Sequence, residues 1–330
     1  MRPTAVPMLQ LSVAPMMEWT DRHCRAFHRV LAPRARLYTE MLHGNALVHG
    51  DRERLLAFDP SEHPVALQLG GSDPLLLAQA ARIGAAAGYD EINLNVGCPS
   101  DRVQAGRFGA CLMREPALVA ECVAAMRAAV AVPVTVKCRL GVDGQEGYED
   151  LAGFVEIVAA TGCDTFVVHA RKAWLSGLSP KQNREVPPLR YEYVRRLKRE
   201  RPGLFVVLNG GLTDIENTLE HARGLDGVML GRAAYHDPYL LHRLERAIHG
   251  GVSEPRADLL RRFRPYVEAQ RAQGVALRHI GRHLLGLFHG EPGGRTFRRL
   301  LTEGAQHADA GWDLVEDALA ATAAPSAAAA

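Results

Sequence analysis

The stretch INLNVGCPSDRVQAGRFGACLM, residues 92–113, joins an apolar strand to a glycine-containing loop that carries Cys98. Asn93 and Asn95 are two residues apart, so in an extended strand their side chains share one face and the apolar residues beside them share the other. A glycine and a proline flank the cysteine. The glycine permits a turn, and the proline fixes the direction in which the chain leaves it. We therefore expect polar groups in a cavity and a thiol presented at the end of a strand.

Seven further runs of this kind determine the expected fold. In chain order the eight strand candidates are LSVAP near Ser12, ARLYTE around Leu37, VALQL from Val65, EINLN from Glu91, VTVKCRL from Val134, DTFVVHAR from Asp164, LFVVLNGG from Leu204 and DGVMLGR from Asp226. Alanine-rich amphipathic segments separate most of them, which is typical of alternating β/α units. Eight such units close a (β/α)8 TIM barrel. An open doubly wound sheet is the alternative, but the first turn lacks its GxGxxG motif.

The chain beyond the last strand has a helical pattern. HGGVSEPR near Gly250 reads as a linker, and LLRRFRPYVEAQRAQG, LRHIGRHLLGLFHG and a segment from Arg295 read as amphipathic helices. We predict a barrel domain at residues 1–245 and a small all-helical bundle domain at 246–320. The alanine-rich end, residues 321–330, is expected to form a disordered tail.

Charge is distributed unevenly along the chain. The net charge is +2, but 12 arginines, no lysine and five acidic residues give the segment from Arg243 to Arg299 a charge of +7, against −5 elsewhere. Its second helix adds a basic stripe at helical spacing: Arg278, His279, Arg282 and His283. This asymmetry favours contact with a polyanion, and a solvated arginine-rich face is the alternative.

The six cysteines form no CxxC pair and no Cys/His spacing typical of a metal site. We expect no bound metal, and free thiols in a reducing cytoplasm. No apolar run has the length of a signal peptide or membrane span, so we expect a soluble protein without a membrane partner. Five cysteines are interpreted as small buried residues: Cys24, Cys111, Cys122, Cys138 and Cys163. Cys98 follows a strand directly and lies where packing is poor, so we predict a chemical role for it.

Polar residues and glycines collect at the ends of the predicted strands. They are Gln68, Asn95, Cys98, Lys137, Arg139, His169, Arg171, Asn209, Gly210, Gly211, Gly231 and Arg232. The carboxyl ends of barrel strands meet at one end, so these residues would form one site. The glycines after the seventh and eighth strands are typical of phosphate binding, which predicts a phosphate-bearing cofactor. Ordinary turns are the alternative.

Lys137 lies in a strand otherwise suited to burial. A buried amine must find an anion or an electron-rich acceptor, because leaving it unpaired costs several kcal/mol. A reduced flavin would be such a partner, and a lysine that reaches solvent from the strand end is the alternative. His169 is a second candidate ligand, for which a hydrogen-bonded core histidine is the alternative.

Eight motifs together resemble one family. They are PMMEWTDRHCR from Pro15, TEM from Thr39, LQLGG from Leu67, the opening stretch, VKCRLG from Val136, VVHARKAWLSGLSPKQNREVPPL from Val167, LNGG from Leu208 and MLGRAAY from Met229. From residue 12 to about 240, and again in the C-terminal part, the chain resembles the tRNA-dihydrouridine synthases. SPKQNREVPPL is similar to the bacterial A subgroup of that family.

The resemblance implies an FMN-binding barrel with a helical tRNA-binding domain. The expected activity is reduction of uridines 20 and 20a in the D loop of tRNA, with electrons from NADPH. Matched motif by motif, the flavin contacts would be Pro15, Met16, Met17, Gln68, Lys137, His169, Asn209, Gly210, Gly211, Gly231 and Arg232. The tRNA contacts would be Lys181, Arg184, Arg295 and Arg298. Asn95 would hold the uracil edge, and Cys98 would be the proton donor.

This assignment fits the chemistry. Reduction of the uracil C5–C6 bond needs a hydride at C6 and a proton at C5 on the opposite face, and a thiol at neutral pH carries that proton. A stacked uridine must also be flipped out to reach the flavin. We hypothesise that Gly106 and Gly109 let the Cys98 loop close over the base.

Two other functions fit parts of the pattern. A barrel flavoenzyme reducing a free pyrimidine or an enone would need the site but not the arginine-rich segment. A non-catalytic RNA-binding protein would need the arginine-rich segment but not the site. For the protein that the resemblance implies, we expect a monomer.

Overall fold

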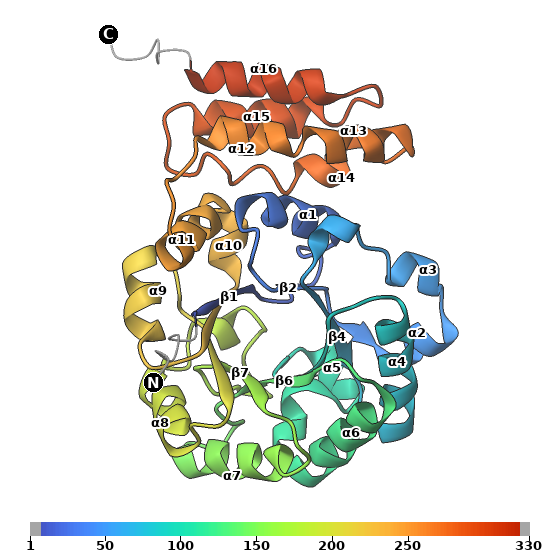
Figure 1. Cartoon of the computed structure of the whole chain (residues 1–330), viewed down its shortest axis with the longest axis vertical. Coiled ribbons are helices and arrows are strands. Elements are labelled where there is room, and N and C mark those ends of the chain that lie inside the picture. Colours follow the sequence, from blue (N-terminus) through green and yellow to red (C-terminus); the bar gives the residue numbers. More distant parts are fainter. Residues whose placement is uncertain (1–7, 324–330) are drawn as a thin grey trace, which may run out of the picture. The chain divides into compact units, whose positions relative to one another are not determined.

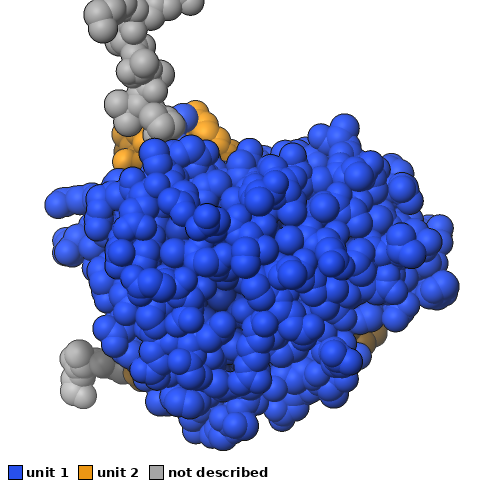
Figure 2. Space-filling view, turned by 90° about the horizontal axis from the view of Figure 1, so that it is seen from below, with its two compact units in different colours: residues 1–17, 36–231 blue, residues 18–35, 232–330 orange. Residues whose placement is uncertain are grey.

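The computed structural model describes residues 8–323, which form two compact units (Figure 1). Within these residues, the first unit is 8–17 together with Arg36–Gly231, and the second is Glu18–Ala35 together with 232–323. Figure 2 colours the two units separately. The second unit thus includes an early segment, residues 18–35, that the sequence pattern did not separate from the barrel.

Eight parallel strands form the barrel of the first unit. They are β1 (Gln10–Val13), β2 (Leu37–Tyr38), β4 (Val65–Gly70), β5 (Glu91–Val96), β6 (Val134–Arg139), β7 (Thr165–His169), β8 (Phe205–Asn209) and β9 (Gly227–Leu230). Their order is β1-β9-β8-β7-β6-β5-β4-β2. Between β1 and β2, Val13 N donates to Arg36 O at 2.9 Å and Arg36 N donates to Leu11 O at 2.8 Å. The predicted (β/α)8 barrel is confirmed, with one unforeseen short strand, β3 (Leu42–His43), beside β4.

The longer helices lie outside the ring of strands (Figure 1). The α-helices of this unit are α2 (Gly44–His49), α3 (Arg52–Leu55), α4 (Pro74–Ala86), α5 (Asp101–Ala105), α6 (Pro116–Ala129), α7 (Tyr148–Ala159), α8 (Tyr191–Glu200) and α9 (Ile215–Ala222). Three short 3-10 helices are η1 (Pro60–Glu62), η2 (Gly109–Arg114) and η3 (Gln182–Arg184). α4 shows why they begin where they do. The Asp73 carboxylate accepts hydrogen bonds from two N–H groups in the first turn of α4. Pro74, at the first position of the helix, has no N–H group that would need an acceptor.

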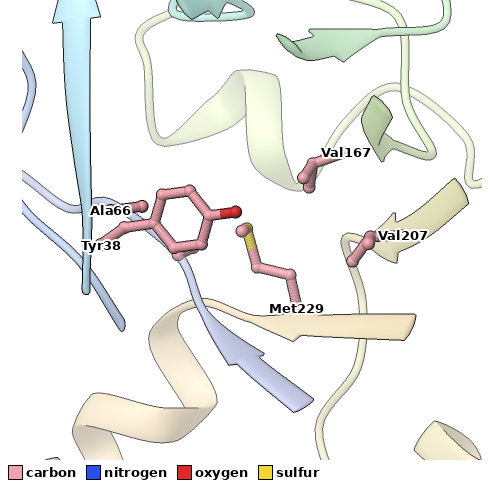
Figure 3. Packing of buried hydrophobic residues seen from close by; sticks show 6 residues of the cluster. Tyr38, Ala66, Val167, Val207 and Met229 are labelled. Carbon is pink, nitrogen blue, oxygen red and sulfur yellow. The ribbon is translucent and has the colours of Figure 1, made fainter. Parts of the chain in front are cut away.

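The barrel interior has an apolar side and a polar side. Ala14, Tyr38, Ala66, Val167, Val207 and Met229 form a buried cluster. Figure 3 shows the labelled side chains pointing toward one another from different strands. Other interior positions on β4, β5 and β6 are polar: Gln68 is paired in register with Asn93, and Asn93 with Thr135. All three are buried.

The second unit is helical. Its helices are α1 (Arg22–Leu31), α10 (Arg232–His236), α11 (Tyr239–His249), α12 (Arg256–Arg262), α13 (Arg264–Ala272), α14 (Leu277–Gly281), α15 (Gly294–Gly304) and α16 (Trp312–Ala323). α15 and α16 lie side by side (Figure 1). Within residues 8–323, no helix is both long and apolar enough to cross a membrane.

The C-terminal helices differ in detail from those predicted. The first predicted helix is split into α12 and α13 near Phe263, because Pro265 cannot continue a helix. The second ends at Gly281 and continues as turns, in which a Cβ at Gly286 would lie only 2.5 Å from a backbone oxygen. α16 was not predicted, and residues 321–323 belong to it. The rest of the expected tail, 324–330, lies outside the described residues.

Candidate active site

The barrel brings predicted site residues from five neighbouring strands together. Gln68 is on β4, Asn95 on β5 and Lys137 on β6, and His169 and Asn209 are the last residues of β7 and β8. Asn95 is paired in register with Lys137, and His169 with Asn209. The convergence predicted from the strand ends is therefore present in the fold.

Lys137 supplies a partly buried positive charge. Its Nζ donates to Asn209 Oδ1 at 2.9 Å, and Asn209 Nδ2 donates to Met229 O at 2.7 Å. Burial, followed by the nearby charge of Arg139, lowers the pKa of Lys137 to about 8. The amine therefore remains mostly charged at neutral pH. Its other ammonium hydrogens have no hydrogen-bond partner among residues 8–323, so they are available to a ligand.

His169 supplies a buried ring. Its Nδ1 has no hydrogen-bond partner within the described part of the chain. Burial lowers the pKa of His169 well below its ordinary value, and Arg139 and Lys137 lower it further, so the ring is neutral at neutral pH. Gly210, at φ +103°, lies under this ring, where an added Cβ would be 3.1 Å from His169 Nε2. The glycine lets the imidazole lie against the backbone.

The other predicted flavin contacts differ in their burial and in the space around them. Gly211 has φ +72°, and a Cβ there would lie 2.5 Å from the Tyr191 hydroxyl, so a side chain would not fit. Gly231 is more open, since a Cβ would meet only Ala14 and Met16, at 3.9 and 4.0 Å. Pro15 and Met16 are partly buried after β1, whereas Met17 is 56% exposed. Arg232 begins α10 and belongs to the second unit.

The loop after β5 holds Cys98 in a defined conformation. Asn95 Oδ1 accepts from Gly97 N at 3.1 Å and from Cys98 N at 3.0 Å. Cys98 O accepts from Ala110 N at 2.9 Å, and the thiol donates to Ser100 Oγ at 3.5 Å. Cys98 is partly exposed, so its thiol is both anchored and accessible.

The glycines of this loop have close neighbours. A Cβ at Gly106 would lie 2.4 Å from the Phe108 ring, and a Cβ at Gly109 would lie 2.6 Å from Cys98 O. Both glycines are thus required by packing in the observed conformation. Closure of the loop over a base stays a prediction.

The remaining cysteines agree with their interpretation as small apolar residues. Cys24, Cys122, Cys138 and Cys163 are buried. Cys111 is partly buried and its thiol donates to Phe108 O at 3.1 Å.

Contacts between loops were not visible in the sequence. Arg139 donates to backbone oxygens of Gly97, Lys172 and Asn183, at 2.9, 3.1 and 2.9 Å. Gln104 Nε2 donates to Pro99 O at 2.9 Å and to Leu175 O at 2.8 Å. These two side chains connect the Cys98 loop to the loop after β7. No spacing signal marks such contacts, because their partners are far apart in the chain.

The loop after β7 presents cations around a buried anchor. Lys181 and Arg184 are exposed, and Asn183 between them is buried. Asn183 Nδ2 donates to Trp174 O at 2.9 Å, and Asn183 Oδ1 accepts from Trp174 N at 2.8 Å. Lys181 makes no ion pair with any described residue. A fixed loop therefore carries both predicted tRNA contacts of this unit.

Fewer arginines of the arginine-rich segment are available to a polyanion than its composition indicated, because many of them form ion pairs within the chain. Seven of its arginines form ion pairs: Arg246, Arg256, Arg261, Arg262, Arg264, Arg282 and Arg299. The expected basic stripe is only partly present, because His283 is buried against Asp21 and Arg282 pairs with the same carboxylate. Arg295 and Arg298 on α15 are exposed and, within residues 8–323, make no ion pair.

The donor set at the strand ends fits a flavin. The free N–H groups of Lys137 suit the electron-rich edge of the ring, the unpartnered Nδ1 of His169 offers a further polar contact, and the backbone at Gly231 leaves space for a phosphate. Among the residues that the structure describes, no group of three or more His, Cys, Asp and Glu side chains could hold a metal ion.

A (β/α)8 barrel with this donor set and a presented thiol fits the class of barrel oxidoreductases. Residues 12–324 match the family model "Dihydrouridine synthase (Dus)". The chain belongs to the dihydrouridine synthase family, whose members are flavin enzymes.

Similar proteins cover almost the whole chain. The tRNA-dihydrouridine(20/20a) synthase of Xanthomonas campestris pv. campestris is 69% identical over 310 residues, 94% of this chain and 92% of that protein. The proteins of the same description from Xylella fastidiosa (strain Temecula1) and Vibrio cholerae serotype O1 are 67% and 54% identical. They align over 94% of this chain, and over 94% and 96% of their own lengths.

Proposed function

We propose that this chain reduces the C5–C6 double bond of uridines 20 and 20a in the D loop of tRNA to 5,6-dihydrouridine. FMN is the bound cofactor, NADPH the electron donor, and the enzyme acts as a cytoplasmic monomer. The observation that carries the proposal is the near full-length identity of 69% to a tRNA-dihydrouridine(20/20a) synthase. At that identity we expect the site residues, and the loops that hold them, to serve the same reaction in both proteins.

Residues at the carboxyl ends of the strands would hold FMN. Lys137 and His169 would contact the ring, with Gln68 and Asn209 beside them, and the glycines after β8 and β9 would take the phosphate with Arg232. Pro15, Met16 and Met17 would complete the site. When bound, FMN supplies the hydride for C6 of the uracil. The charged Lys137 would stabilise negative charge on the reduced ring, which its partly buried position supports.

Cys98 would donate the proton to C5. Its thiol is accessible, and Asn95 and Ala110 hold the backbone on both sides of it. A general acid must be held within hydrogen-bond reach of the atom that it protonates. When the proton leaves, the thiolate is reprotonated by solvent, so the uracil gains one hydride and one proton per turnover.

Cations would bind the folded tRNA while the target uridine is flipped out. Lys181 and Arg184 would contact it from the barrel domain, and Arg295 and Arg298 from the helical domain at residues 246–320. The exposure of all four side chains supports this assignment.

The decisive experiment is mass mapping of D-loop uridines after unmodified tRNA is incubated with the protein, FMN and NADPH. The expected result is a gain of two hydrogens at positions 20 and 20a. Reduction of free uracil or an enone with unchanged tRNA would favour a small-molecule flavoenzyme. Tight tRNA binding by a colourless protein without any reduction would favour a non-catalytic RNA-binding protein.

A further inference from the structure

A chain of hydrogen bonds crosses the polar side of the barrel interior, from the Cys98 loop to Glu91. It begins where the N–H groups of Gly97 and Cys98 donate to Asn95 Oδ1. Three bonds of 2.8 Å follow: Asn95 Nδ2 to Gln68 Oε1, Gln68 Nε2 to Asn93 Oδ1, and Asn93 Nδ2 to Thr135 Oγ1. The Thr135 hydroxyl donates to Glu91 Oε1 at 2.6 Å. We call these five side chains, Asn95, Gln68, Asn93, Thr135 and Glu91, the amide relay.

Both ends of the amide relay fix its direction. The backbone N–H groups at one end can only donate. The carboxylate of Glu91 at the other end accepts, and it receives two further bonds, from Arg36 at 3.0 Å and from Tyr38 at 2.8 Å. Every carboxamide between the two ends therefore has one allowed orientation. Reversing any of them would set donor against donor on one side and acceptor against acceptor on the other.

This fixed direction decides what the relay offers to a ligand. The Oδ1 atom of Asn95 already accepts two hydrogen bonds. The Nδ2 group of Asn95 has two hydrogens, and one of them is donated to Gln68 Oε1. Its remaining hydrogen, like the second Nε2 hydrogen of Gln68, has no partner in residues 8–323. Asn95 can thus present only a donor. That donor suits a carbonyl oxygen of a pyrimidine and does not suit its N3–H group.

We propose that Glu91, Thr135 and Asn93 are positioning residues: they fix the amide of Asn95 as a donor to the uracil carbonyl and, through it, hold the backbone of Cys98. The proposal rests on the proposed function for the identity of the substrate. None of the three residues touches a reacting atom. Their effect is transmitted through hydrogen-bond polarity, and buried networks of this kind are sensitive to a single missing member.

Thr135 is the member at which the amide relay can be broken with least change of shape. Its hydroxyl accepts from Asn93 and donates to Glu91, and valine has the same shape with neither function. Tyr38→Phe is the matched control. It also removes one buried hydroxyl that donates to Glu91 Oε1, but that hydroxyl is not part of the relay.

The test compares the flavin-loaded wild type with Thr135→Val, Thr135→Ser and Tyr38→Phe. Reduced enzyme is mixed with saturating unmodified tRNA, and dihydrouridine is followed in a single turnover. For Thr135→Val we expect a rate at least tenfold lower, with the tRNA Kd within twofold of wild type. Thr135→Ser and Tyr38→Phe should stay within threefold of the wild-type rate, because both keep the relay.

A second readout needs no tRNA. Iodoacetamide labelling of Cys98, followed by peptide mass spectrometry, should be several-fold faster in Thr135→Val, because its loop is held less firmly. Labelling of Cys111 is the internal control. If Thr135→Val fails to fold, Asn93→Ala breaks the relay one member further along and should show the same two changes.

Equal effects of Thr135→Val and Tyr38→Phe on both readouts would overturn the proposal, since a purely structural role predicts equality. Wild-type behaviour of Thr135→Val would overturn it as well. If wild-type enzyme did not reduce tRNA, the proposed function would fail, and the labelling rates of Cys98 would still decide whether the relay holds the loop.

Discussion

The guanidinium of Arg139 donates from Nε to the carbonyl oxygen of Gly97 at 2.9 Å, directly before Cys98. Its NH1 group donates to Lys172 O and Asn183 O in the loop after β7. Arg139 is 4% exposed, and although burial lowers its pKa to about 10, it stays charged at neutral pH. One buried cation at the end of β6 therefore joins the thiol loop to the loop that carries Lys181.

We expect Arg139→Lys to lower the free energy of unfolding by about 2 kcal/mol, because an ammonium group cannot reach three carbonyl oxygens in two loops and leaves buried acceptors unpaired. Urea titration measures the change. Arg196→Lys is the control, since Arg196 pairs with Glu200 on the exposed face of α8 and its replacement should matter little. Equal loss of stability in the two variants would contradict the role given to Arg139.

We predict that Cys98→Ala retains FMN and binds tRNA but forms dihydrouridine about 100-fold more slowly or worse, the scale on which a positioned general acid contributes. Flavin absorbance, tRNA binding and single-turnover reduction measure the three properties. Cys111→Ala is the control, because its thiol donates to Phe108 O and has no predicted role in the reaction. A normal single-turnover rate in Cys98→Ala would remove Cys98 as the proton donor.

The barrel could be predicted because each of its eight main strands is a short apolar run between helix-length segments. The failures have physical causes. β3 consists only of Leu42 and His43, and this pair forms no apolar run. The predicted helix at residues 277–290 ends at Gly281, and beyond it the backbone at Gly286 leaves no room for a Cβ. Residues 18–35 belong with the C-terminal helices through contacts between distant parts of the chain, which local pattern does not encode.

The strand-end polar residues of the candidate site could be predicted for the same reason as the barrel. What the sequence did not reveal is how they are held. Thr135 and Glu91 are ordinary strand residues by composition, and the role proposed for them depends on hydrogen bonds that join β4, β5 and β6. The basic stripe was misjudged in part, because helical spacing does not show that His283 would be buried against Asp21.

Lys181→Ala should weaken tRNA binding and reduce the slope of log K against log salt by about one, because one phosphate contact is lost. Arg184→Ala should do the same. Binding titrations at several salt concentrations measure both. Lys198→Ala is the control, since that amine lies on α8 and pairs with Asp226 at 2.8 Å. Unchanged slopes for both Lys181→Ala and Arg184→Ala would mean that this loop faces away from the RNA.

Neighbouring arginines on α15 allow a sharper comparison. Arg298 makes no ion pair with a described residue, whereas Arg299 pairs with Glu303 at 3.3 Å. We expect Arg298→Ala to weaken tRNA binding with a slope reduced by about one, and Arg299→Ala to have a smaller effect. Arg295→Ala should resemble Arg298→Ala. A larger loss for Arg299→Ala than for Arg298→Ala would exclude this face of the helix from tRNA binding.

The start of α1 predicts how stability depends on pH. Asp21 Oδ1 accepts from His23 N and Cys24 N, and the carboxylate pairs with His283 at 3.0 Å. Burial raises the pKa of Asp21, but the hydrogen bond and charge interaction with His283, the hydrogen bond from Cys24 N and the charge interaction with His23 together outweigh it and bring the pKa to about 2, below its ordinary 3.8. The unfolded chain thus binds the proton more tightly, so the stabilisation is complete above about pH 4 and is lost as the pH falls toward about 2.

Asp21→Asn keeps the helix cap and removes the charge. At neutral pH it should lower the free energy of unfolding by about 2 kcal/mol, the value that corresponds to the lowered pKa. Urea titrations of wild type and variant from neutral pH down to about pH 2 should show this difference shrinking below about pH 4. His283→Gln should reduce the same pH-dependent component, because it removes the histidine whose interactions lower the pKa of Asp21. A difference between wild type and Asp21→Asn that stays constant over the whole range would show that the charge of Asp21 does not stabilise the fold.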